Sequence, residues 1–250
     1  MRKVDWQVSI GFSPRQAIDA SPERVFSMVS SHTITHLFLH NLKGLWYDPL
    51  EGNAELLRQY PAPISFEKMG QGETDVPVIF PVCTVNPLEG IDRATQVVSA
   101  GLEKGVRFWR LYPQEQQWAV THPVCTKILQ WLHKERCVLL LDASPSNVEM
   151  VATQFVGSLP IVTSFHYYDS ADWLLRFQHS SKVFVTTRNL HGPGTIAHAL
   201  ADFSERLVYC SGAPFGSPAS SALLVEDIGL QQQIFETNST RLIRSVYRDY

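Results

Sequence analysis

The chain has 250 residues, of which 44% are hydrophobic, and its 21 Lys and Arg nearly balance its 24 Asp and Glu. This length allows one large core, and the near-neutral charge provides no basic field for a nucleic acid. The first residues lack the apolar stretch of a signal peptide, and no segment reaches the roughly 18 apolar residues of a membrane helix. We therefore expect a cytoplasmic protein with neither membrane nor nucleic-acid partners.

Short apolar, β-branched segments recur along the chain, and each is the length of a buried strand. Several are almost continuously apolar, which is typical of parallel strands covered on both faces. Eight strands are predicted, at Val4–Ile10, Thr35–His40, Val78–Val85, Val106–Tyr112, Cys137–Asp142, Pro160–His166, Lys182–Arg188 and Arg206–Cys210.

Helical spacing fills most of the gaps between these strands. The first helix is predicted to start at Ser21-Pro22, an N-cap residue followed by proline at the first helical position. Segments 41–52 and 60–77 are longer than ordinary loops. If the strands form a barrel, we expect these segments to extend over its mouth. Further helices are predicted at Asn53–Gln59, Ile91–Glu103, Val124–Glu135, Asn147–Phe155, Ala171–His179, Thr195–Phe203 and Leu230–Tyr247.

Eight alternating strand and helix units are compatible with a closed (β/α)8 TIM barrel or with an open doubly wound sheet. Gly11-Phe-Ser-Pro after the first strand is too poor in glycine for a dinucleotide-binding turn, which favours the barrel. We predict an α/β protein whose single domain spans residues 1–250.

The four cysteines are widely spaced and lie mostly in apolar segments, so they are predicted to be reduced and buried. They are Cys83, Cys125, Cys137 and Cys210.

Several segments, in this order, resemble landmarks of the amidohydrolase superfamily, in particular its amidohydrolase-related branch of metal-dependent TIM-barrel hydrolases and decarboxylases. The resemblance covers nearly the whole chain and implies a barrel with its site at the carboxyl ends of the strands. The segments are Asp48-Pro-Leu-Glu-Gly52-Asn53, Lys104–Pro113, Phe165-His166, Glu205–Pro214 and Gln233–Ile243.

The resemblance also implies positions for metal ligands. The His-x-His pair of the first strand matches Gln7 and Ser9, and the histidine of the fifth strand matches Asp142. His166 matches the sixth-strand histidine, whereas Gly212 stands in place of the eighth-strand aspartate. Zinc and related ions need about three nitrogen, sulfur or carboxylate ligands, so the inherited metal site is predicted to be lost and no cofactor is expected.

Three residues are candidates for chemistry. His166 could act as a general acid or base, or remain as a hydrogen-bonded imidazole without a role. Asp142 follows four apolar residues and needs a partner, which Arg107, Arg188 or the Ser144 backbone amide could supply. Arg188 could bind a carboxylate or phosphate, or form a structural ion pair.

A second set of residues is predicted to contact a ligand. These residues end strands or lie in the loops that follow them, where a barrel places its site. The glycine-rich turn after His191 could bind an anion or serve only the chain reversal, and the tyrosines could line a pocket or fill the core. The set is His40, Asn41, Arg107, Tyr112, Tyr167, His191 and Ser211.

We predict the first of three functions and keep the other two as alternatives. The first is a small-molecule-binding barrel, non-catalytic or regulatory, which could be a homo-oligomer or a partner of an active homologue. The second is an active hydrolase or decarboxylase-type lyase acting on a small carboxylate or amide, with His166, Asp142 and Arg188 in the site. The third is a site rebuilt around Asp142, His166 and His40 that holds a divalent metal such as zinc.

Overall fold

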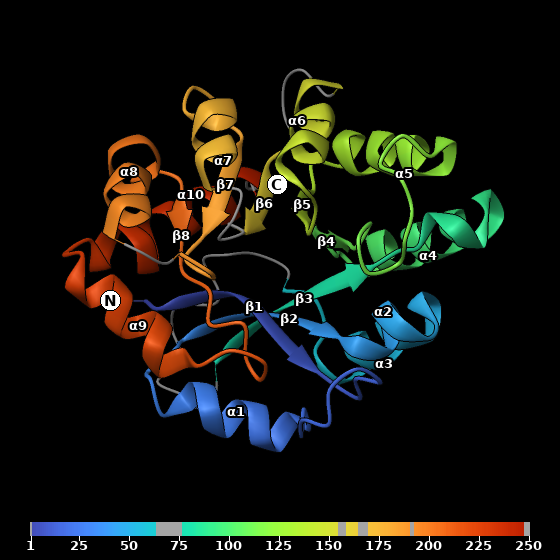
Figure 1. Cartoon of the computed structure of the whole chain (residues 1–250). Coiled ribbons are helices and arrows are strands. Elements are labelled where there is room, and N and C mark those ends of the chain that lie inside the picture. Colours follow the sequence, from blue (N-terminus) through green and yellow to red (C-terminus); the bar gives the residue numbers. More distant parts are fainter. Residues whose placement is uncertain (1, 64–76, 155–158, 165–169, 191–192, 248–250) are drawn as a thin grey trace.

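Eight parallel strands form the centre of the molecule, and helices surround them (Figure 1). The computed structural model describes residues 2–63, 77–154, 159–164, 170–190 and 193–247. The strands follow one another in chain order, as in a TIM barrel, and each predicted strand is confirmed to within a few residues. They are β1 Val4–Ile10, β2 His36–Asn41, β3 Val78–Thr84, β4 Phe108–Leu111, β5 Val138–Leu141, β6 Ile161–Ser164, β7 Val183–Thr186 and β8 Leu207–Val208.

Backbone hydrogen bonds close the ring between its first and last strands. The Trp6 amide donates to the Tyr209 carbonyl at 3.1 Å, and the Ser9 amide donates to the Ala213 carbonyl at 2.9 Å. The predicted (β/α)8 barrel is thus confirmed, and an open doubly wound sheet is excluded.

The helices confirm most of the predicted segments, and α4 has the predicted bounds. Two helices were not predicted, α2 in the segment expected to cross the mouth and α9 after β8. The predicted final helix is divided into a π-helical turn, Gln233–Thr237, and α10. The α-helices are α1 Pro22–Ser30, α2 Leu42–Trp46, α3 Pro49–Gln59, α4 Ile91–Glu103, α5 Pro123–Lys134, α6 Pro145–Gln154, α7 Ser170–Phe177, α8 Pro193–Phe203, α9 Pro218–Asp227 and α10 Asn238–Val246.

Aromatic side chains fill the half of the barrel interior that lies toward the amino ends of the strands. Trp6 stacks on Phe38 with 3.8 Å between ring centroids, Phe38 stacks on Phe80, and Phe108 packs edge-on against Phe38. Leu242 and Ile243 of α10 belong to the same buried cluster. Because this layer is dry and apolar, any polar site inside the barrel must lie nearer the carboxyl ends of the strands.

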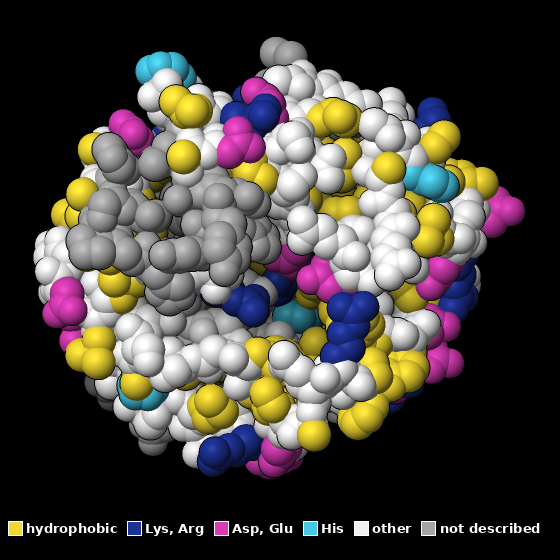
Figure 2. Space-filling model, in the orientation of Figure 1, with side chains coloured by type: hydrophobic (Ala, Val, Ile, Leu, Met, Phe, Trp, Pro, Cys, Tyr) yellow, Lys and Arg dark blue, Asp and Glu magenta, His cyan; other side chains and the backbone are white. Residues whose placement is uncertain are grey.

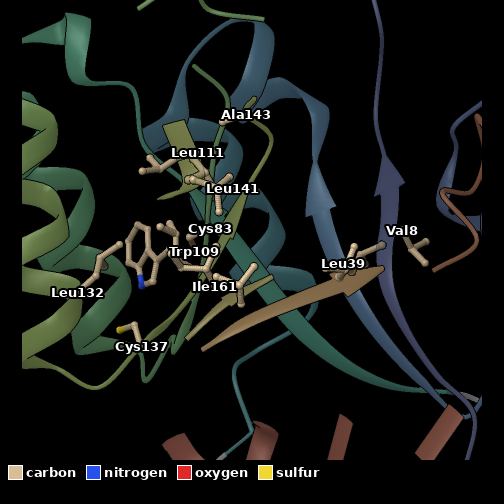
Figure 3. Close-up of a cluster of buried hydrophobic side chains, with 14 of the residues drawn as sticks. Val8, Leu39, Cys83, Trp109, Leu111, Leu132, Cys137, Leu141, Ala143 and Ile161 are labelled. Carbon is tan, nitrogen blue, oxygen red and sulfur yellow. The ribbon is translucent and has the colours of Figure 1, made fainter. Parts of the chain in front are cut away.

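A larger apolar layer lies between the strands and the surrounding helices. Trp109 of β4 points outward and lies beside Leu132 of α5 and Cys137 (Figure 3). The four cysteines are free and buried, as predicted.

The segment expected to cross the barrel mouth is fixed by a close helix contact. Asn53 of α3 pairs with the Thr84 backbone of β3, accepting from its amide at 2.9 Å and donating to its carbonyl at 2.8 Å. A side chain at Gly52 would come within 2.3 Å of the Gly44 nitrogen, so glycine is required where α2 and α3 meet. Of segment 60–77, residues 64–76 lie outside the described residues.

Within the described part of the chain, no helix combines the length and the apolar character needed to cross a bilayer.

Asp5 is a fully buried acid at the junction of β1 and β8. Its Oδ1 accepts from the backbone amides of Ser211 at 3.0 Å and Gln7 at 3.2 Å, while its Oδ2 has no partner among the described residues. Burial raises the pKa of Asp5 to about 6, although the hydrogen bonds from Ser211 oppose the shift. The folded chain therefore favours the protonated acid.

We expect this acid to make stability depend on pH. Its contribution is fully present below about pH 4 and is lost as pH rises through 6, because the folded pKa exceeds the unfolded value of 3.8. Relative to wild type, Asp5→Asn should gain about 2 kcal/mol of unfolding free energy between pH 4 and pH 7. Urea unfolding across this range measures the gain, with exposed Asp227→Asn as control. An equal pH dependence in wild type and Asp5→Asn would contradict this account.

Candidate functional site

A polar layer lies directly above the aromatic layer, because inward-facing side chains recur every second residue along a strand. Two residues after Phe38 comes His40, and two residues after Phe108 comes Arg110. The same step leads from Leu140, also in the inner cluster, to Asp142. On β1 the pairing register shifts between Asp5 and Val8, and beyond the shift Gln7 and Ser9 face inward as well.

These side chains line a cavity of about 280 Å³ at the carboxyl ends of the strands. Figure 2 shows a hollow at the centre of this face, where basic, acidic and histidine side chains gather beside residues that are not described. This cavity is the size of a small metabolite, near the lower limit of ligand pockets in proteins.

Arg110 and Asp142 form a buried ion pair within the cavity. Nε and Nη2 of Arg110 both donate to Oδ2 of Asp142, at 2.7 and 2.6 Å. The Arg110 guanidinium also lies over the Tyr112 ring, 4.8 Å from its centroid. Only 4% of the Arg110 side chain is exposed, so the pair fixes the guanidinium firmly in the cavity wall.

His40 connects this pair to β1. Its Nδ1 lies 3.4 Å from Nη1 of Arg110, and its Nε2 lies 3.1 Å from Oγ of Ser9. Burial and the Arg110 charge hold the pKa of His40 well below its usual range. The imidazole is therefore neutral at physiological pH.

Arg188 lies over the backbone of Gly212. A Cβ atom at Gly212 would come 3.2 Å from Nε and 3.5 Å from Cζ of Arg188, and Gly212 has φ +67°. Arg188 lines the cavity, and the described residues offer it neither an ion pair nor a hydrogen bond. Because Gly212 has no side chain, there is room over it for the Arg188 guanidinium, which has no ion-pair partner among the described residues.

Two cavity-lining residues carry buried oxygens that lack partners among the described residues. They are the hydroxyl of Tyr112 and Oε2 of Glu115. Burial and the nearby Asp142 charge raise the pKa of Glu115. A buried polar atom without a partner costs about 1–3 kcal/mol, so both oxygens are available to a ligand group.

The described side chains do not fit an ion of the zinc class. Nowhere among them do three or more His, Cys, Asp or Glu come together as metal ligands. At the positions implied by the resemblance, Gln7 accepts a hydrogen bond from the Cys210 thiol and Ser9 contacts His40. A divalent cation here would also face the like charge of Arg188.

The structure brings together some of the predicted site residues and not others. Asp142, Arg188, His40 and Tyr112 all line the cavity. His166, Tyr167 and His191 lie outside the described residues.

Three predicted ligand contacts lie elsewhere in the fold. Asn41 caps α2 by accepting from the Lys43 amide at 3.0 Å. Ser211 is buried, and its backbone amide donates a hydrogen bond to Asp5. Arg107 precedes β4, and its guanidinium donates to the adjacent Val106 carbonyl.

The expected partners of Asp142 were wrong, since Arg110 binds it instead of Arg107, Arg188 or the Ser144 amide. Arg107 and Arg110 point to opposite faces of the strand, because side chains alternate along it. The inward position of Phe108 would have identified Arg110. Glu115 was also missed, and no pattern in the sequence distinguishes it from other loop carboxylates.

Several proteins of known structure have the same barrel as this chain. No protein-family model and no curated protein matches the sequence. An uncharacterised TIM-barrel protein from Bordetella bronchiseptica has a TM-score of 0.75 and 11% identity, covering 99% of this chain and 100% of the other. A probable 2-pyrone-4,6-dicarboxylic acid hydrolase from Acinetobacter baumannii, with citric acid bound, has a TM-score of 0.65 and 17% identity, covering 97% and 99%.

A dihydroxybenzoic acid decarboxylase from Polaromonas sp. JS666, with bound manganese and 2-nitroresorcinol, has a TM-score of 0.63 and 13% identity, covering 97% of each chain. The fold is the TIM barrel, which this chain shares over nearly its whole length with these proteins. The predicted resemblance is therefore confirmed for the architecture. Identities this low carry the fold alone, so activity must be argued from the site.

The buried ion pair gives a test of this site. Arg110→Met should lower the unfolding free energy by about 3 kcal/mol, because it leaves Asp142 without its partner in a poorly solvated cavity. Arg176→Met, which removes exposed pairs with Asp172 and Glu149, should cost less than about 1 kcal/mol. Denaturant unfolding measures both, and equal losses would show that the Arg110 pair is not effectively buried.

Proposed function

We propose that this protein is a small-molecule-binding barrel of amidohydrolase descent whose metal ligands have been lost, and that it binds a small anion without catalysis. Arg188 carries the proposal. Its guanidinium lines the cavity, is held over Gly212 and has no carboxylate partner in the described part of the chain. A guanidinium of this kind binds carboxylates through two parallel hydrogen bonds.

The balance of charge in the cavity supports an anionic ligand. Arg15, Arg110 and Arg188 line it together with two carboxylates, Asp142 and Glu115. Arg110 and Asp142 neutralise each other, and among the described lining residues Arg15 and Arg188 then outnumber the one remaining carboxylate, Glu115. Positive charge remains on Arg188 and on Arg15, whose guanidinium stacks on Trp46 at 4.4 Å.

The donor set supports binding in preference to metal-dependent chemistry. Gln7, Ser9 and Gly212 supply no histidine or carboxylate at three positions that the resemblance assigns to metal. The Polaromonas decarboxylase has bound manganese, and we propose that this chain has lost the corresponding metal site. A regulatory role, as a homo-oligomer or beside an active homologue, is part of the proposal.

An active hydrolase or decarboxylase is the second candidate function. Glu115 favours it, because a partly buried carboxyl group with a raised pKa is suited to donate a proton. In this case Asp142, Arg188 and His166 would complete a metal-free site for a small carboxylate or amide. The hydrolases and decarboxylases among proteins of this fold make the alternative chemically reasonable.

We expect calorimetric titration of EDTA-treated protein with citrate to show binding that added zinc or manganese does not strengthen. Arg188→Met should weaken this binding at least tenfold, because a hydrogen bond between charged groups contributes about 1.5–3 kcal/mol. Binding that EDTA abolishes and zinc restores would contradict the proposal and support a metal site.

The glycine under Arg188 offers a further test. Gly212→Ala places a Cβ 3.2 Å from Nε of Arg188 and should displace the guanidinium, weakening citrate binding about tenfold. Gly229→Ala is the matched control, since Gly229 has a similar φ of +71° and no neighbour within 4 Å of an added Cβ. Both variants carry the same backbone strain, so equal affinities would remove Arg188 from the binding site.

Turnover of an amide, lactone or aromatic-acid substrate would favour the enzyme. We expect none from the wild-type chain in product analysis by liquid chromatography. Turnover that disappears in both Glu115→Gln and His166→Ala would establish the second function in place of the first.

A further inference from the structure

A continuous set of polar contacts crosses the barrel mouth from β5 to β1. Asp142 Oδ2 accepts from Arg110, Nη1 of Arg110 lies 3.4 Å from Nδ1 of His40, and Nε2 of His40 lies 3.1 Å from Oγ of Ser9. All four side chains line the same cavity as Arg188.

The chemistry of the groups determines where the hydrogens lie. A guanidinium has N–H donors and no acceptor, so Nδ1 of His40 must accept from Arg110. A neutral imidazole carries one N–H, which must then be on Nε2.

This tautomer reverses the usual relation between serine and histidine. Nε2 donates to Ser9, so it has no lone pair with which to remove the Ser9 proton, and Ser9 is not an activated nucleophile. The Ser9 hydroxyl accepts from His40, and its own hydrogen is directed elsewhere. Within the described part of the chain, His40 is the only hydrogen-bond partner of this hydroxyl.

We infer that Asp142, Arg110 and His40 form a hydrogen-bond relay that holds the Ser9 hydroxyl as a donor to the bound anion. The inference rests on the proposed function and deepens it. The ligand class is a small carboxylate, one oxygen of which accepts from Ser9 while Arg188 supplies the charge. Asp142, Arg110 and His40 are positioning residues, and Ser9 is a binding residue.

The tautomer can be observed without any ligand. In protein labelled with ¹⁵N-histidine, we expect the His40 Nδ1 resonance to be that of an unprotonated nitrogen, and Nε2 that of an N–H, from pH 6 to pH 8. The resonances are assigned by their loss in His40→Gln. A proton on Nδ1 would overturn the relay, while citrate binding to the wild-type chain would leave the proposed function intact.

Affinity for citrate tests the donor role of Ser9. Ser9→Ala should weaken binding about fivefold, the effect of one lost hydrogen bond, whereas Ser144→Ala, a serine outside the cavity lining, should leave it unchanged. His40→Gln keeps an acceptor for Arg110 and a donor for Ser9, so its affinity should stay within about twofold of wild type. His40→Met removes both and should match Ser9→Ala.

The outcomes separate the two proposals. Unchanged affinity in Ser9→Ala would overturn the donor role while citrate binding persists. Equal losses in His40→Gln and His40→Met would show that His40 acts only through packing, which would also overturn the relay. If wild-type protein binds no carboxylate, the proposed function fails and the donor role fails with it, whatever the tautomer.

Discussion

The buried ion pair between Arg110 and Asp142 is the interaction on which the pocket depends. Taking the Arg110 charge out of water costs several kcal/mol, and its close contacts with the partly buried Asp142 offset this cost. Nε and Nη2 of Arg110 both bind Oδ2 of Asp142, so Nη1 can contact His40. One pair thus joins β4 and β5 and determines the environment of the imidazole on β2.

The barrel makes this arrangement possible by separating apolar and polar layers. Trp6, Phe38, Phe80 and Phe108 exclude water below, and the next inward residue of a strand lies in the cavity. The charged side chains of the cavity therefore have the low-dielectric aromatic layer on one side and the open mouth of the barrel on the other. In such a site each hydrogen bond is stronger than in water, and a group without a partner is costly.

The strand pattern could be read from the sequence because each β segment is a short apolar run, and its side chains are buried on both faces. The strand ends also showed where Asp142, Arg188 and His40 would lie. Arg110 could not be separated from Arg107 without fixing which residues of β4 face inward. The π-helical turn near Gln233 and the helix α9 depend on packing against the barrel, which local spacing does not encode.

The contacts between the side chains of the site could not be predicted from the sequence. The resemblance matched Gly212 to a position of an aspartate, but the contact between Gly212 and Arg188 could be found only in the folded structure. Likewise, the pairing of Ser9 with His40 arises from the register of β1 and β2, in which these residues are direct partners. Long-range register of this kind follows from barrel closure and is not a property of either segment alone.

The most direct measurement of the central claim is a crystal structure of metal-stripped protein soaked with a small carboxylate. A carboxylate bound between the Arg188 guanidinium and the Ser9 hydroxyl is the result that this account requires. Soaking with zinc or manganese instead gives the decisive contrast. An ion coordinated in the cavity by Asp142, His166 and His40 would contradict the claim that a guanidinium supplies the positive charge of this site.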